Sequence, residues 1–244
     1  MSGAPAVAGS AAGAVGAAVA VVAVADVPPQ PWRNGGGLTR ELLAWPSHED
    51  WTVRVSVADI ERDGRFSAFP GVTRWFAVLQ GEGVRLAFDE GAGGEHLLRR
   101  GDAPFAFDGA AAPACRLVDG PTRDLNLMLR GEARAAGRLQ RAAAGRTWHP
   151  AAAACGLFTA VAGTCHDDRG GVVELPAQAL AWFAAAPASL RFEPAADATN
   201  AAGAADAAGA ADAAGAADAV DANDAAGAAV VGWWLAVAPH GASA

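Results

Sequence analysis

The chain has no lysine, no tyrosine and no excess of positive charge. All 18 basic residues are arginine, and the formal net charge of −8 argues against a nucleic-acid partner and against an anionic membrane surface. No run of about 18 strongly apolar residues occurs, so no membrane-spanning helix is expected. The uncharged N-terminus lacks the basic region of a secretory signal. We therefore expect a cytoplasmic protein that recognises neither nucleic acid nor membranes.

Cysteine and histidine are too sparse and too scattered to suggest a metal centre. The three cysteines form no Cys-x-x-Cys pair, and we interpret them as free thiols in a reducing cytoplasm. The five histidines lack the close spacing that many β-barrel enzymes use to hold a catalytic metal. We therefore expect no metal and no cofactor.

Two low-complexity segments flank the more varied sequence. Residues 1–16 are rich in Ala and Gly and predict a flexible tail. Residues 195–229 contain 21 Ala, six Asp and no basic residue, and they have no apolar stripe that could pack against a core. We predict a disordered insertion there, which a fold tolerates because the entropy of loop closure grows slowly with length.

The remaining sequence reads as short strands separated by Gly, Pro and Asp, beginning with residues 17–25. Residues 51–58 alternate, with three valines on one face and Arg54 and Ser56 on the other. Residues 124–129 alternate in the same way. Regular short strands at this spacing predict an all-β barrel or sandwich. Because the strand pattern repeats, we expect two stacked β-lobes, residues 17–144 and 145–244, with the insertion in the second.

The stretch 31–41 holds three adjacent glycines, which permit positive φ angles and close approach of the backbone to another group. It lacks the Gly-Lys-Ser/Thr ending of a P-loop and the βαβ context of a dinucleotide-binding fingerprint. Two interpretations stay open. The stretch is either a tight structural turn or a loop whose N–H groups line a pocket together with Trp32 and Asn34.

The polar faces of the two alternating strands also have two interpretations. They face solvent, or they face the interior of a barrel, where an arginine needs a carboxylate partner or a ligand. If both polar faces point inward, Arg54, Ser56, Asp124 and Asn126 together form a pocket that suits a small anion. Two phenylalanines in the loop 63–71 either rim this site or plug the mouth of the barrel.

Several motifs, in this order along the chain, resemble the HutD/Ves family. They are Trp32-Arg-Asn-Gly-Gly-Gly-Leu-Thr-Arg-Glu41, Trp51-x-x-Arg-x-Ser56, Asp63-Gly-x-Phe-Ser-x-Phe-Pro-Gly-x-x-Arg74, Gly81-x-Gly83 and Asp124-Leu-Asn-Leu-Met128. The resemblance implies a cupin-like (RmlC-type) double β-barrel, or bicupin, without a bound metal and with a pocket near these motifs. It also implies a place in bacterial histidine utilisation, where the protein would bind a small metabolite and moderate the pathway.

With this resemblance, the motif chemistry suits a small anionic metabolite of histidine degradation, either urocanate or a formyl- or formimino-glutamate. Arg54, helped by Arg40 or Arg74, would hold the carboxylate. Nearby acids and amides would accept or donate hydrogen bonds, and aromatic side chains would cover a ring face. The candidate ligand-binding residues are Trp32, Asn34, Gly35, Gly36, Thr39, Arg40, Glu41, Arg54, Ser56, Phe66, Phe69, Arg74, Asp124, Asn126 and Met128.

Three functions follow from these observations, and we prefer a metabolite-binding regulator. The alternative is an isomerase or hydrolase, which would need Glu41, Asp124 or a local histidine as its base. The third is a protein-interaction module that uses the acidic insertion as its contact. The sequence leaves open whether the protein forms a homodimer.

Overall fold

The computed structural model describes residues 19–89, 93–196 and 230–237. The predicted tail 1–16 and residues 197–229 of the predicted insertion lie outside the described residues. Helical structure in the described ranges is limited to α1 (Ala133–Ala136) and the short 3₁₀ turns η1 (Val24–Asp26) and η2 (Gly109–Ala111). A helix with the length and hydropathy that crossing a bilayer requires does not occur in these ranges. The predicted all-β class is therefore confirmed.

The first lobe consists of two antiparallel sheets whose inner faces share one core. The larger sheet has the strand order β2-β3-β4-β11-β6-β9, and the smaller one has the order β5-β10-β7-β8. Ile60 and Phe76 of the larger sheet pack with Leu86 and Cys115 of the smaller one. The strands are β2 (Gln30–Pro31), β3 (Gly37–Trp45), β4 (Val53–Ile60), β5 (Gly64–Arg65), β6 (Val72–Gln80), β7 (Val84–Ala87), β8 (Glu95–Leu98), β9 (Phe105–Asp108), β10 (Ala114–Leu117) and β11 (Thr122–Arg130).

The second lobe repeats this plan. Its larger sheet has the order β1-β17-β14-β19-β12, and its smaller sheet has the order β13-β18-β15-β16. Leu157 and Trp234 of the larger sheet pack with Leu190 and Phe192 of the smaller one. The strands are β1 (Val19–Ala23), β12 (Arg138–Ala143), β13 (Thr147–Trp148), β14 (Ala154–Thr159), β15 (Gly163–Asp167), β16 (Val172–Leu175), β17 (Ala179–Phe183), β18 (Leu190–Pro194) and β19 (Val230–Val237).

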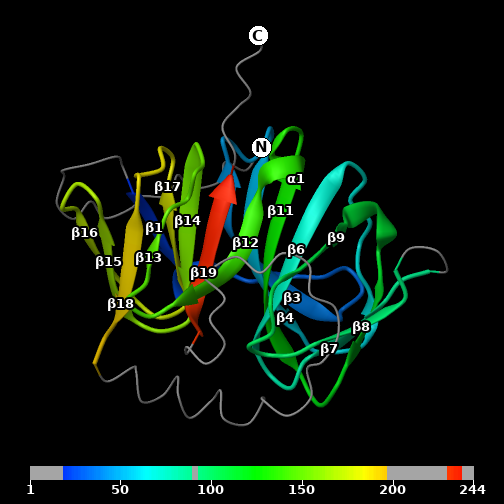
Figure 1. The fold of residues 1–244 in the computed structure, drawn as a ribbon. Coiled ribbons are helices and arrows are strands. Elements are labelled where there is room, and N and C mark those ends of the chain that lie inside the picture. Colours follow the sequence, from blue (N-terminus) through cyan, green and yellow to red (C-terminus); the bar gives the residue numbers. More distant parts are fainter. Residues whose placement is uncertain (1–18, 90–92, 197–229, 238–244) are drawn as a thin grey trace.

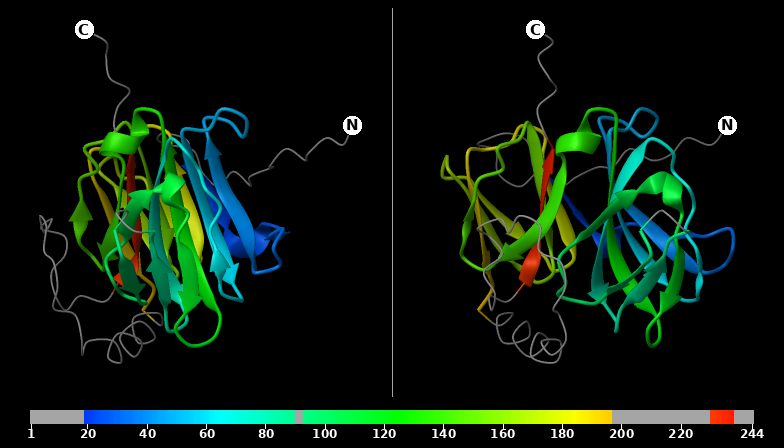
Figure 2. Two further views of the ribbon diagram at one scale, coloured as in Figure 1. Left: turned by 90° about the vertical axis from the view of Figure 1, so that its right-hand side faces the viewer. Right: turned by 45° about the vertical axis from the view of Figure 1, so that its right-hand side comes forward.

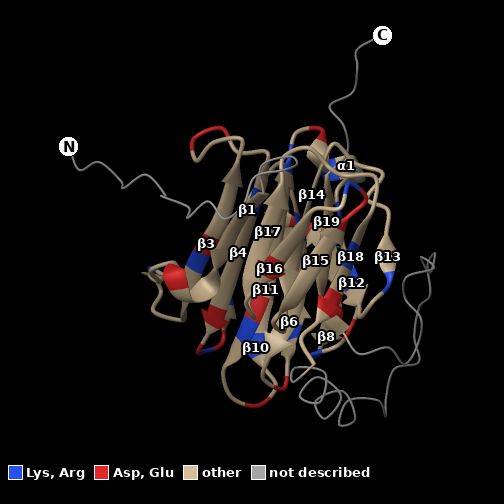
Figure 3. Cartoon of the chain, turned by 90° about the vertical axis from the view of Figure 1, so that its left-hand side faces the viewer, with Lys and Arg blue, Asp and Glu red and all other residues tan. Residues whose placement is uncertain are grey.

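The two lobes stand side by side and pack through the outer faces of their larger sheets (Figures 1 and 2). The valines of β4 and the leucines of β11 lie in one buried cluster with Phe158, Trp182, Trp233 and Leu235 of the second lobe. Strands β14, β17 and β19 carry no charged residue (Figure 3). Both faces of these central strands are buried, which explains why they read as continuous apolar runs rather than as alternating patterns.

A small group of polar side chains joins the lobes at one end of this interface. The carboxylate of Asp59 lies 2.5 Å from Arg40 Nη1 and 2.6 Å from Arg123 Nε. Arg123 Nη1 also donates to Gln178 Oε1 of the second lobe at 2.8 Å. Burial alone would raise the pKa of Asp59, but the hydrogen bonds from both arginines hold it below its usual value.

Strand pairing crosses the boundary expected at residue 144. The first strand, β1, pairs antiparallel with β17, and β12 pairs antiparallel with β19. Both strands therefore lie in the larger sheet of the second lobe, although the expected range 17–144 assigns them to the first. Chain order suggested that assignment, whereas the partner of a strand is fixed by contacts between residues far apart in the sequence.

Candidate functional site: a cationic pocket in the first lobe

The burial of the apolar faces of β4 and β11 decides in which direction their polar faces point. In β4, Val53, Val55 and Val57 are completely buried against the second lobe. Because side chains alternate along a strand, Arg54 and Ser56 must point to the opposite side, into the first lobe. The same rule turns the leucines of β11 toward the second lobe and its polar side chains inward. The interior interpretation is therefore the one that the structure adopts.

Strand register then gathers the inward side chains. Asn126 lies directly opposite Ser56, and Met128 lies opposite both Arg54 on one neighbouring strand and Arg74 on the other. Directly opposite residues in an antiparallel sheet have Cβ atoms about 5 Å apart on the same face. Three strands that are separated in sequence thus place two arginines, an amide, a hydroxyl and a thioether at one spot.

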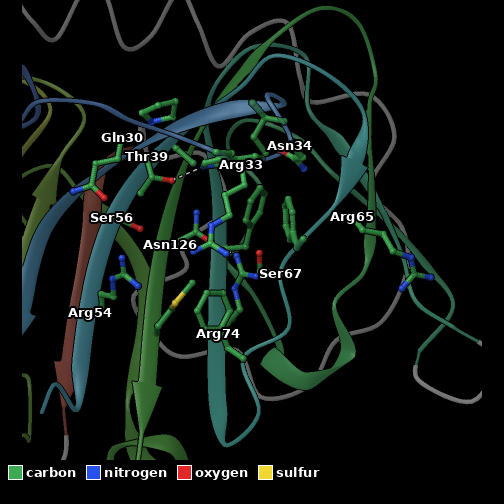
Figure 4. Close-up of a pocket in the computed structure, with 18 residues that line it drawn as sticks. Gln30, Arg33, Asn34, Thr39, Arg54, Ser56, Arg65, Ser67, Arg74 and Asn126 are labelled. Carbon is green, nitrogen blue, oxygen red and sulfur yellow. Dashed lines mark hydrogen bonds between the residues drawn. The ribbon is translucent and has the colours of Figure 1, made fainter. Parts of the chain in front are cut away.

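A cavity of about 400 Å³ opens at this spot (Figure 4). Its wall contains four arginines and six aromatic or long apolar side chains, but no Asp, Glu, His or Cys. The residues that line it are Gln30, Pro31, Trp32, Arg33, Asn34, Thr39, Arg54, Ser56, Ala58, Ile60, Arg65, Phe66, Ser67, Phe69, Arg74, Phe76, Asn126 and Met128. The wall is therefore both apolar and positively charged, which suits an organic anion.

Arg74 on β6 is the deepest of the cations, and only 5% of its surface is exposed. Its Nη2 donates to Asn126 Oδ1 at 2.7 Å, while its Nε is buried without a hydrogen-bond partner. The guanidinium carbon lies 4.9 Å from the ring centre of Phe66, 5.2 Å from that of Phe107 and 5.7 Å from that of Phe69. The three rings hold the cation in place and leave it without a carboxylate partner among the described residues.

Burial, and after it the nearby charge of Arg54, lowers the pKa of Arg74 to about 10. The side chain nevertheless remains protonated at neutral pH, because that value is still well above 7. A buried positive charge that no acidic side chain balances is energetically costly, and an anionic ligand would relieve that cost.

Arg54 differs from Arg74 because it has an acidic partner. Its Nε lies 2.5 Å from Glu41 Oε2, although this ion pair does not have hydrogen-bond geometry. The other oxygen, Glu41 Oε1, lies 2.9 Å from Nδ1 of the exposed His48. Arg54 is thus partly neutralised and partly exposed, whereas Arg74 is neither. The sequence had given Arg54 the leading role and Arg74 a helping one, and the geometry favours the reverse.

The glycine stretch forms the tight structural turn that was one of the two interpretations. The N–H groups of Gly35 and Gly36 are bonded within this turn, while Trp32 and Asn34 line the cavity. Gly35 has a φ of +66°, and Gly36 N donates to Asn34 Oδ1 at 3.0 Å, so the chain turns tightly. A side chain at Gly37 would lie 2.3 Å from the carbonyl oxygen of Asp59, so only glycine lets β3 approach β4 here. This turn sets Trp32 at the cavity, where its Nε1 donates to the Thr39 hydroxyl at 2.7 Å.

Ten of the fifteen candidate residues line the cavity, and five do not. The ten are Trp32, Asn34, Thr39, Arg54, Ser56, Phe66, Phe69, Arg74, Asn126 and Met128. Gly35 and Gly36 form the turn beside it, and Glu41 contacts it only through Arg54. Arg40 is a correction to the sequence-based set: it points away from the cavity and pairs with Asp59 near the second lobe, because the alternation of β3 puts it on the face opposite Thr39.

Asp124 faces the interior but lies outside the cavity lining. It is fully buried, and the Thr122 hydroxyl donates to its Oδ2 at 2.8 Å, while its Oδ1 has no hydrogen-bond partner. Burial raises the pKa of this carboxyl well above its usual value, and the charge of Asp59 raises it further. The neutral acid is the form that this environment favours.

The sequence reasoning missed several polar lining residues. They are Gln30, Arg33, Arg65 and Ser67. The last three stand inside the quoted motifs, so their position between candidate residues was the available signal. In the described part of the chain, no three His, Cys, Asp or Glu side chains come together as a metal site would require.

These features define a two-lobed, cupin-like protein whose first barrel contains a cationic pocket. The chain belongs to the HutD family, because the family model described as HutD matches residues 24–202. This membership confirms the resemblance that the motifs indicated.

Similar sequences and a similar solved structure support this membership. An uncharacterized 21.2 kDa protein in the hutC 3' region of Pseudomonas putida is 44% identical over 105 residues, which are 42% of this chain and 54% of that protein. Protein Ves of Citrobacter koseri is 39% identical over 110 residues, 44% of this chain and 56% of that protein. The aligned part spans about half the length of these relatives. A solved structure of HutD from Pseudomonas fluorescens SBW25 (formate condition) matches with a TM-score of 0.63 and 29% identity, over 72% of this chain and 94% of that chain.

Proposed function

We propose that the first lobe binds a small carboxylate metabolite of histidine degradation, of the urocanate or formyl- or formimino-glutamate type, and that this binding modulates histidine utilisation. The observation that carries the proposal is Arg74, a buried cation in the cavity wall with an unpartnered Nε and no carboxylate partner among the described residues. The link to histidine utilisation rests on the HutD family and on the hutC-region relative.

The chemistry of the wall supports a carboxylate in particular. A guanidinium presents a planar fork of donors that matches the two oxygens of a carboxylate. Asn126 already uses one Nη2 donor of Arg74, so the unused donors remain for a ligand. Trp32 and Phe66, which meet edge to face with ring centres 6.5 Å apart, offer an apolar surface for the rest of the molecule.

We prefer binding to catalysis because of the side chains that the cavity wall contains. An isomerase or hydrolase needs a general base within hydrogen-bond reach of its substrate. No Asp, Glu, His or Cys belongs to the described lining. Of the acids suggested as bases, Glu41 is tied to Arg54, and Asp124 lies outside the lining. Incubation of the candidate metabolites with the protein, followed by NMR, separates the two functions, because an enzyme would generate product.

Isothermal titration calorimetry of the full chain against urocanate and N-formylglutamate tests the proposal. We expect micromolar binding of one or both, on the order of −8 kcal/mol. Arg74→Met should weaken this binding about 100-fold, because it removes charge-assisted hydrogen bonds worth about 1.5–3 kcal/mol each. Arg116→Gln is the matched control, since Arg116 is exposed on β10 and lies outside the cavity lining. The proposal fails if neither compound binds, or if Arg74→Met binds as tightly as the control.

A further inference from the structure

One edge strand of the second lobe lacks the features that keep the edges of sheets from pairing with other chains. Strand β1 is the outermost strand of the larger sheet, beside β17 (Figure 1). Its five residues, Val19–Ala23, include neither a charged residue nor a proline. Every other edge strand in the described ranges has four residues or fewer, or carries charge, as β12 does with Arg138 and Arg141. Short or charged edges resist pairing with another chain, so β1 is the exception.

The hydrogen bonds of β1 show which of its backbone groups point outward. Val24 N, directly after the strand, donates to Gln178 O at 2.9 Å. Because hydrogen-bonded and non-hydrogen-bonded positions alternate in an antiparallel pair, every second residue before Val24 also turns its N–H and C=O toward β17. The backbone groups of the other residues point away from the sheet, and they have no hydrogen bond to another described residue. These residues are Val19, Val21 and Ala23.

The outward groups of β1 match those of a second copy of the same strand. In an antiparallel pair centred on Val21, this residue lies opposite its own counterpart, and Val19 lies opposite Ala23 of the partner subunit. All three outward-facing residues then stand at hydrogen-bonded positions. The side chain of Val21, which is 39% exposed, lies at the centre of the contact. Such a contact has twofold symmetry and closes at two copies, because each chain offers this edge once.

The distribution of charge supports a second copy of this chain as the partner. Residues 1–25 carry no charged side chain, although the whole chain has a formal net charge of −8. No charge on β1 therefore attracts an acidic or a basic partner. Two copies repel each other through their net charge, and an uncharged contact keeps that repulsion small. Salt screens the remaining repulsion, so pairing through β1 should strengthen as the ionic strength rises.

We propose that β1 is a dimerisation surface, through which two copies join the larger sheets of their second lobes into one continuous antiparallel sheet. A contact of five residues per copy buries less than the roughly 1,200 Å² of a standard interface, so the dimer is weak and reversible. We expect a dissociation constant on the order of 10–100 μM. Residues of β1 do not line the cavity of the first lobe, so this proposal is independent of the proposed function.

Sedimentation equilibrium of the full chain, over concentrations that bracket this dissociation constant, tests the proposal. Val21→Lys should raise the dissociation constant about tenfold or more, because two like charges then lie opposite each other and the apolar contact is lost. Val21→Thr keeps the branched, uncharged side chain and should keep the dimer. Val172→Lys is the matched control, since Val172 is 60% exposed at the start of β16, another edge strand. It should leave the dissociation constant unchanged.

Amide hydrogen exchange of the unsubstituted chain, followed by NMR, identifies what covers the edge. The Val21 N–H points outward, so its exchange should slow as the protein concentration rises. Slow exchange at every concentration would show that another part of the same chain covers β1, and fast exchange at every concentration would show that nothing does. Either result overturns the proposal. A dimer that Val21→Lys leaves intact overturns it as well, because the two copies would then meet through a different surface.

Discussion

In the second lobe, apolar side chains and two thiols fill the space between the sheets, and Trp148 and Trp234 stack there with ring centres 4.7 Å apart. In the first lobe, the space between the sheets also holds Arg74, Asn126 and a cavity of about 400 Å³. The two lobes share one sheet plan, so the plan alone does not produce the cationic cavity. The inward-facing side chains of β4, β6 and β11 make the difference.

The interiors of the two lobes also differ in how they affect the stability of the fold. Packed apolar side chains stabilise the second lobe through burial, and no buried charge opposes them among its described residues. In the first lobe, Arg74 and Asp124 are buried without an ion-pair partner, and such groups lower stability. Binding sites commonly sacrifice stability in this way, because the groups that await a ligand are unsatisfied without it. Mutations in the two interiors should therefore have opposite effects.

The largest effect is expected in the interior of the second lobe. Trp234→Ala removes a fully buried indole and its stacking with Trp148, and it should lower the free energy of unfolding by about 3–5 kcal/mol. Urea denaturation followed by circular dichroism measures this loss. Ligand affinity of the folded variant should equal that of the parent chain, because Trp234 does not line the cavity. A loss below about 1 kcal/mol would contradict the tight packing of this lobe.

Urea denaturation of a first-lobe variant should show the opposite change in the free energy of unfolding. Arg74→Met keeps much of the side-chain volume and removes a buried charge, so the ligand-free protein should become more stable by about 1–3 kcal/mol. Arg116→Gln, an exposed change of equal charge, should alter stability by less than about 0.5 kcal/mol. Were Arg74→Met to destabilise the chain, Arg74 would be a structural residue rather than one that awaits an anion.

A smaller effect depends on pH. Because the pKa of Asp124 is raised in the folded protein, the folded state keeps a proton that the unfolded chain releases above the usual value of 3.8. Stability is therefore lost as pH rises from about 4 through the raised pKa. Asp124→Asn removes this loss, so the variant should exceed the parent chain in stability at pH 7 by at least about 1 kcal/mol. Denaturation at several pH values measures the difference between the two proteins. A difference that stays constant from pH 4 to pH 7 would show that Asp124 is ionised in the folded protein.

Much of the site could be read from the motifs, because local patterns mark where polar side chains interrupt an apolar sequence. The alternation in residues 51–58 correctly placed Arg54 and Ser56 on the same face of a strand. The motifs also supplied Asn126 and Met128, which line the same cavity. Arg40 was assigned to the wrong face because the motif was treated as one unit, whereas a strand turns every second residue away. Arg33 was missed although it stands between two candidate residues of the first motif, because a loop arginine at a cavity and a solvated arginine look alike in the sequence.

The sequence by itself determined the strands, the two-lobed all-β class and the set of residues from which a pocket could be made, since alternation and turn residues act locally. Only the tertiary structure decided which face of β4 and β11 points inward, because this depends on the second lobe, which buries the valines and leucines. It also decided that Glu41 neutralises Arg54 and leaves Arg74 unpaired, because the charges that balance each other are set by distances between strands far apart in the chain.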